Sequence, residues 1–181
     1  MKKTIPILTG LVVVGLVASF HASKIKATPI VLQPVQTQIT QRVSSANDIY
    51  PTVKGATNPD ITQANISQNI CNKNWSTKSI RPPVSYTDKV KRDLMISQHL
   101  TGVKGDYELD HLISLEIGGS PTSLDNLWME PYVTSIPDGG AKVKDSVENR
   151  LHKEVCSGSL LLSDAQHIVV TDWYAYYKSM K

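Results

Sequence analysis

Asp110 and His111 stand side by side within the apolar stretch Tyr107–Leu115. A carboxylate is a good ligand for a hard divalent cation, and an imidazole can accept a proton near neutral pH. Neighbouring residues of a strand point to opposite faces, so both can serve one site only if the strand bends or if one contacts a metal and the other the substrate. Taken alone, the pair favours a simpler interpretation, in which His111 is a core histidine packed with Leu109 and Ile113.

The residues around the pair change that interpretation. A Gly118-Gly119 turn follows, and Asn126 comes 15 residues after His111, directly before Leu127-Trp128. Further motifs flank this set: Ile70-Cys71, Trp75, Arg81-Pro82-Pro83, Tyr86-Thr87, Lys144-Asp145, Glu148-Asn149-Arg150-Leu151-His152 and Val155-Cys156-Ser157-Gly158. The whole pattern resembles the HNH endonuclease superfamily. It is most similar to a group of small exported bacterial HNH-like proteins, over roughly residues 60–177.

The resemblance implies a ββα-metal fold and the hydrolysis of phosphodiester bonds. It makes His111 the general base that takes a proton from the attacking water. It makes Asp110 a ligand of one divalent ion, Mg²⁺ or Mn²⁺, although Zn²⁺ and Ni²⁺ also suit such ligands. Asn126 would orient the imidazole, through its side-chain amide or its backbone. The alternative for Asn126 is an ordinary turn asparagine.

The chain departs from the family pattern at the second metal ligand. Many family members supply a His or Asn from the last helix of the core, but here that helix begins Gly140–Lys144, without a ligand at the usual place. Glu148 is the first candidate to replace it, followed by Asp145 and His152. Each of the three has the plain alternative of a polar helix residue. Without such a ligand, the site would bind a metal weakly or be inactive.

Basic residues cluster between Lys73 and Arg92, where six Lys or Arg accompany one acid. Four of the 19 basic residues of the chain precede Thr28 and no acidic residue does, which leaves 15 basic against 16 acidic side chains after it. A polyanionic partner therefore depends on local clusters, and a solvated basic face is the alternative. The nuclease hypothesis expects phosphate contacts from four residues: Arg81, Lys89, Arg92 and Lys144.

The N-terminal residues predict export. Lys2 and Lys3 precede the apolar run Ile5–Phe20, and small residues follow, as in a secretory signal peptide at 1–27. An uncleaved membrane anchor is the alternative, although the run is short for a span of about 20 residues. Residues 28–60, rich in Pro, Gln and Thr, are expected to be a disordered linker before a domain at 61–181. The protein is thus expected to be secreted or periplasmic, without stable membrane association after cleavage.

Cys71 and Cys156 are expected to form one disulfide, because an even pair in an exported chain most simply does so. A catalytic thiol or a zinc pair is the alternative, but the two lie far apart and neither is in a CxxC motif. A bridge closing so long a loop would stabilise the fold by roughly 4–5 kcal/mol in the chain-entropy model.

Helices and short extended segments alternate along the domain. The expected elements are a short helix capped by Thr62, a helix from about Thr87, strands at 107–115 and 123–130, a helix at 141–156 ended by Gly158, and a closing helix with a capping box at Ser163 and Gln166. The helix at 141–156 has one apolar stripe, made of Val143, Val147, Leu151 and Val155. This order predicts an α+β fold, with a small two-stranded antiparallel sheet packed by flanking helices.

The sequence supports three hypotheses of function. The first is an exported, metal-dependent nuclease with little sequence specificity, which cuts DNA, or RNA as the second choice. The second is an inactive binding or interaction module on the HNH-like scaffold, favoured by the missing ligand and the nearly neutral charge. The third is a structural exported domain in which Asp110 and His111 form a buried hydrogen-bonded pair.

Overall fold

The computed structural model describes residues 49–181, which form an α+β fold with three α-helices and a two-stranded sheet. The predicted α+β class is therefore confirmed. The predicted signal peptide and the linker as far as residue 48 lie outside the described residues. Within residues 49–181, no helix is both long enough and apolar enough to cross a membrane.

The sheet pairs β1 (Tyr107–His111) with β2 (Leu127–Pro131) in antiparallel register, and Asp110 lies opposite Trp128. β2 is buried from its first residue to Glu130. Both strands are shorter than expected. The second starts after residue 126, because the preceding residues form a turn instead of an extended segment.

The side chain of Asn126 ends the first strand early. Its Oδ1 accepts a hydrogen bond from the Ile113 N–H at 2.9 Å, and its Nδ2 donates to the Ile113 carbonyl at 3.0 Å. These bonds replace the ladder bonds that a continuing strand would need. The chain therefore bends after His111 and passes through the 3-10 helix η4 (Leu115–Ile117).

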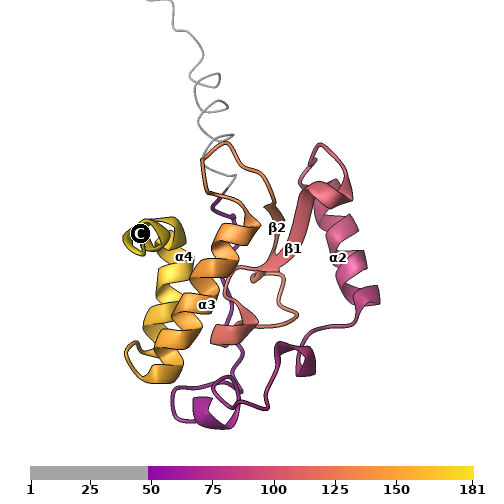
Figure 1. Cartoon of the computed structure of the whole chain (residues 1–181). Coiled ribbons are helices and arrows are strands. Elements are labelled where there is room, and N and C mark those ends of the chain that lie inside the picture. The colour runs from indigo at the N-terminus through magenta and orange to yellow at the C-terminus, as the bar shows by residue number, and fades with distance from the viewer. Residues whose placement is uncertain (1–48) are drawn as a thin grey trace, which may run out of the picture. The chain divides into compact units, whose positions relative to one another are not determined.

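The helices lie on two sides of the sheet. Helix α2 (Val84–Ser97) packs beside the strands, whereas α3 (Ala141–Ser157) and α4 (Leu162–Ser179) pack side by side on the other side (Figure 1). The apolar stripe predicted for α3 is confirmed in part. Three of its members are fully buried and Val143 is half-buried. Gly158 ends α3 in the left-handed conformation, with φ of 78°, as expected for a helix C-terminus.

Residues 49–60, expected to belong to the linker, pack against the domain instead. Ile49 is fully buried, and its carbonyl accepts a hydrogen bond from the Trp173 indole at 2.9 Å. The Gly55 N–H donates to the Asp125 carbonyl at 2.8 Å. Burial of Ile49 against Trp173, the largest fully buried side chain, stabilises this segment. The polar residues around Ile49 hid this apolar contribution in the sequence.

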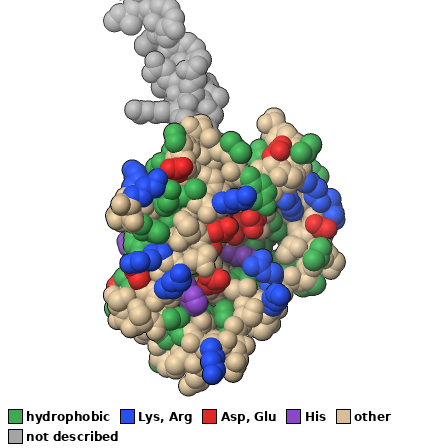
Figure 2. All heavy atoms as spheres, viewed as in Figure 1, with side chains coloured by type: hydrophobic (Ala, Val, Ile, Leu, Met, Phe, Trp, Pro, Cys, Tyr) green, Lys and Arg blue, Asp and Glu red, His purple; other side chains and the backbone are tan. Residues whose placement is uncertain are grey.

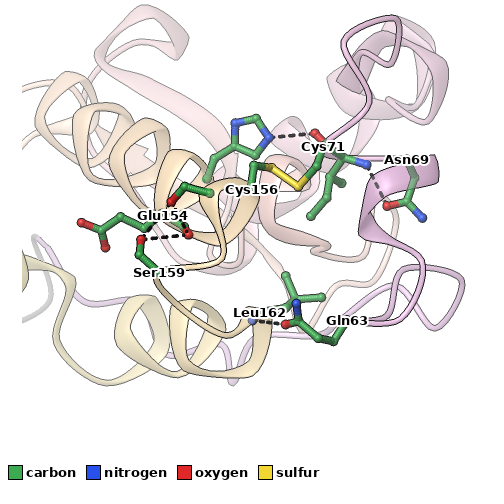
Figure 3. The surroundings of a disulfide bond; sticks show 10 residues. Gln63, Asn69, Cys71, Glu154, Cys156, Ser159 and Leu162 are labelled. Atoms are coloured by element: carbon green, nitrogen blue, oxygen red, sulfur yellow. Dashed lines mark hydrogen bonds between the residues drawn. A yellow bond between two sulfur atoms is a disulfide. The ribbon is translucent and has the colours of Figure 1, made fainter.

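Two expected helix caps are wrong. The segment after Thr62 forms only a one-turn 3-10 helix, η1 (Ile66–Gln68), and the Asn65 side chain accepts from the Thr62 N–H. Ser163 and Gln166 form no capping box on α4. Gln166 donates instead to the Ile117 carbonyl at 2.9 Å. The Leu162 N–H at the start of α4 donates to the side chain of Gln63, which is distant in sequence (Figure 3).

The predicted disulfide between Cys71 and Cys156 is confirmed. It ties the segment after η1 to the last turn of α3 (Figure 3). Beside it, His152 Nε2 lies 2.8 Å from the Ile70 carbonyl. A carbonyl only accepts, so this ring nitrogen carries a proton and supports the same junction.

Candidate functional site

Asp110 and His111 line one pocket of about 120 Å³, although they are neighbours on a strand. They share it because β1 ends at His111 and the chain bends there. Arg81 and several carboxyl groups from other elements line the same pocket, among them those of Asp145 and Glu148. Figure 2 shows acidic side chains gathered next to a histidine near the middle of one face of the molecule. The pocket thus combines a base, several carboxylates and one arginine.

The imidazole of His111 is held in one tautomer. Its Nε2 lies 3.1 Å from the Pro121 carbonyl oxygen, which can only accept a hydrogen bond. Nε2 therefore carries the proton, and Nδ1, which has no hydrogen-bond partner within residues 49–181, keeps its lone pair. Burial lowers the pKa of His111 below its ordinary value, so the ring is neutral at pH 7. A neutral imidazole with a free Nδ1 is a competent proton acceptor.

Asn126 forms hydrogen bonds with the loop that lies between it and His111. It is fully buried, and its Nδ2 donates to the Ser120 carbonyl at 2.9 Å as well as to Ile113. Ser120 precedes Pro121, the residue that accepts from the imidazole. No hydrogen bond joins Asn126 to the His111 ring within residues 49–181, and the role of Asn126 in orienting the imidazole, through its amide or its backbone, stays a prediction. Asn126 thus ties down the loop that carries the Pro121 carbonyl.

Lys144 is buried at the centre of the site. Its side chain is 1% exposed, and its Nζ donates to Asp110 Oδ2 at 2.6 Å, to Glu148 Oε1, and to the His111 carbonyl at 3.1 Å. The expectation that Lys144 contacts phosphate is wrong, because the carboxylates withdraw its ammonium from solvent. The sequence holds one sign of this arrangement: Lys144 and Glu148 lie four residues apart on one helix face.

Three carboxyl groups surround this ammonium in different protonation environments. Burial opposes ionisation of Asp110, but Lys144 outweighs it and holds the pKa of Asp110 below its usual range. Burial raises the pKa of Glu148 to about 8 and that of Glu130, on β2, to about 10, each against the opposing effect of Lys144. Glu130 Oε1 is buried without a hydrogen-bond partner. One ammonium and retained protons thus offset the negative charge of the cluster.

The expected metal ligands do not fit a divalent ion as they are arranged. Asp110 and Glu148 both contact the Lys144 ammonium, and no three potential ligand atoms converge around them within residues 49–181. Asp145 lines the pocket but stays exposed. His152 lies away from the pocket, in a group with the two cysteines, whose sulfurs are bonded to each other.

The remaining basic residues differ in how free they are. Arg81 is exposed at the pocket and forms no ion pair among the described residues. Lys89 lies on α2 and pairs with Asp93 at 2.6 Å, with both side chains in solvent. Arg92 is exposed on the same helix. Two of these three residues, Arg81 and Arg92, are therefore available to an anion without breaking an ion pair.

The comparisons with known proteins neither support nor contradict the resemblance to the HNH superfamily. The scan against protein-family models, the search of curated proteins and the search of solved structures each found no match. The site is therefore interpreted from its own geometry, and the resemblance continues to rest on the motifs alone.

Proposed function

We propose that this protein is an exported nuclease that hydrolyses phosphodiester bonds, with His111 as the general base. The observation that carries the proposal is the fixed, neutral imidazole, whose Nε2–H is bound to the Pro121 carbonyl and whose ring lines an accessible pocket. Nδ1 is the atom that takes the proton from the attacking water. The order β1, β2, α3 also suits the ββα core of the HNH superfamily, which belongs to the same proposal.

Exposed arginines support a polyanionic substrate. Arg81 at the pocket would contact the phosphate next to the scissile bond, and Arg92 and Lys89 on α2 would contact phosphates further along the strand. Such contacts address the backbone rather than the bases, which agrees with low sequence specificity. DNA is the favoured substrate and RNA the second. The disulfide supports export, because such bonds persist in oxidising compartments.

The resemblance also implies a divalent ion at Asp110, Mg²⁺ or Mn²⁺ first. Carboxylate oxygens are suitable ligands for these ions. However, the two expected ligands already pair with Lys144, so the arrangement does not fit the ion. The proposal therefore assigns proton transfer to His111 and phosphate binding to Arg81, and it includes no step through a metal.

Digestion of supercoiled plasmid tests the proposal. The wild-type protein should nick the plasmid, and His111→Ala should slow the reaction by about 10²–10⁴-fold, the usual contribution of a general base. His167→Ala changes an exposed histidine on α4 and should leave the rate unchanged. Equal rates for wild type and His111→Ala would refute the assignment of the base. A wild-type protein that leaves plasmid and RNA intact in all buffers would refute the nuclease.

An inactive binding module is the second candidate. The lack of three converging metal-ligand atoms around Asp110, within residues 49–181, favours it, because no divalent ion would then stabilise the charge that develops on a scissile phosphate. In that case fluorescence polarisation should detect saturable binding of duplex DNA, lost on Arg81→Ala, while the DNA stays intact. Cleavage that depends on His111 would exclude this second candidate.

A further inference from the structure

We propose that the ammonium group of Lys144, rather than a divalent ion, is the cation of the His111 site, where it positions both Asp110 and His111. The inference rests on the proposed nuclease function and identifies the charge around which that site is built. It does not make Lys144 a catalytic residue, because its side chain is 1% exposed and does not reach substrate.

The contacts of Lys144 match an ammonium group in number and kind. An ammonium has three N–H donors and no acceptor. Lys144 has three acceptors: Asp110 Oδ2 at 2.6 Å, the His111 carbonyl oxygen at 3.1 Å, and Glu148 Oε1. Two of them come from β1 and the third from one turn further along α3. Every donor is therefore satisfied without water.

The same contacts disfavour a metal at this position. A divalent ion bound to Asp110 and Glu148 would lie close to the ammonium that contacts both carboxylates. Like charges a few ångströms apart repel strongly in a buried site, where little solvent screens them. Displacing the ammonium would remove Lys144 from its partners within the core. Metal binding would therefore require both carboxylates to exchange one cation for another.

Lys144 also controls where the base lies. Its bond to the His111 carbonyl fixes the backbone of that residue, whereas the Pro121 carbonyl fixes the far end of the ring. The imidazole is thus held from two directions by groups on different segments. Loss of the ammonium should displace His111, and a displacement of about 1 Å can lower a rate by 10²-fold.

Titration with Mn²⁺, followed by electron paramagnetic resonance, tests the identity of the cation directly. Chelator-treated wild-type protein should show no saturable Mn²⁺ site. Lys144→Ala removes the ammonium from two carboxyl groups, so this variant should gain a saturable Mn²⁺ site. The double change Lys144→Ala with Asp110→Asn should remove that Mn²⁺ site. A wild-type Mn²⁺ site that Asp110→Asn abolishes would overturn the inference. The wild-type titration decides this even if the Lys144 variants do not fold.

Plasmid cleavage in excess EDTA gives the second readout. The wild type should keep its activity, and Lys144→Ala should lose about 100-fold in kcat with little change in KM, as expected for a misplaced base. Once the EDTA has been removed, added Mn²⁺ should restore part of the activity of Lys144→Ala only. Lys142→Ala, an exposed lysine on the same helix, is the matched control and should behave as wild type.

The outcomes separate the inference from the proposed function. Wild-type cleavage that EDTA abolishes and Mg²⁺ restores would overturn the role of Lys144 and leave the nuclease standing. Absence of cleavage under every condition would refute the nuclease. The Mn²⁺ titration would then still decide whether Lys144 holds the cation position.

Discussion

Helix α3 is attached to the rest of the fold at both ends, by bonds of different kinds. Near its start, Lys144 and Glu148 form a buried ionic cluster with Asp110 of β1. At its last turn, Cys156 is covalently bonded to Cys71. The ionic attachment lies against the candidate base, whereas neither cysteine lines its pocket. Positioning of the site and covalent stabilisation of the fold are therefore assigned to opposite ends of one helix.

Removal of the covalent attachment should have the largest effect on stability. The double change Cys71→Ser with Cys156→Ser should lower the free energy of unfolding by roughly 4–5 kcal/mol, because the bridge spans a sequence separation of 85 residues. Urea denaturation measures the loss. Where the variant is still folded, its rate of plasmid cleavage should stay near wild type. A large loss of rate in the folded variant would contradict the separation between the two ends.

Removal of the ionic attachment should cost somewhat less stability and far more activity. Lys144→Met leaves buried carboxylates without their cation, which typically costs about 3–5 kcal/mol. Lys142→Met is the exposed control and should change the free energy of unfolding by no more than about 0.5 kcal/mol. Added salt should affect the wild type little, since a buried pair is poorly screened. Strong destabilisation of the wild type by salt would argue against a buried cluster.

The loop that holds the imidazole can be loosened without touching either attachment. Asn126→Ala removes a fully buried amide that bonds Ile113 and Ser120, and should cost about 2–3 kcal/mol. Cleavage should also slow, because the Pro121 carbonyl is no longer fixed. Asn74→Ala, at an exposed asparagine, serves as the control in the same denaturation and rate measurements. A loss of stability with an unchanged rate would show that the loop does not position His111.

A pH dependence is also expected at the ionic end. The pKa of Glu148 rises from an ordinary 4.5 to about 8, chiefly through burial. The folded state therefore binds more protons than the unfolded state between these values, so its stability should fall as pH rises from about 4.5 to 8. Glu148→Gln should reduce this slope in denaturation measurements, and the part that arises from Glu130, whose pKa is raised to about 10, should remain. The double serine variant should keep it, and a slope lost with the disulfide would contradict the comparison.

The covalent end was predictable from the sequence and the ionic end was not. Two cysteines allow only one intramolecular pairing, so Cys71 and Cys156 could be matched by counting. A lysine has many possible partners. The partners of Lys144 come from β1 as well as from its own helix, and no local pattern brings 110 next to 144. The helix spacing to Glu148 was visible, yet it is equally typical of exposed ion pairs.

The elements show the same division between local and distant causes. The glycine stop of α3 and its apolar stripe depend on neighbours in sequence, and the stop and three of the four stripe residues appear where expected. The end of β1 depends on the amide of Asn126, which captures Ile113 from 13 residues away. The start of α4 likewise depends on Gln63 rather than on an adjacent cap. Apolar periodicity carries no information about such distant polar bonds.

The burial of Lys144 has a consequence for inheritance. Mutations that reach this site one at a time pass through an intermediate with unbalanced charge, so positions 110, 144 and 148 should evolve as a set. A lineage that exchanged the lysine for a histidine or an asparagine would be free to recruit a metal in its place. The residue at position 144 would then indicate whether a related protein uses a lysine ammonium or a metal ion at this site.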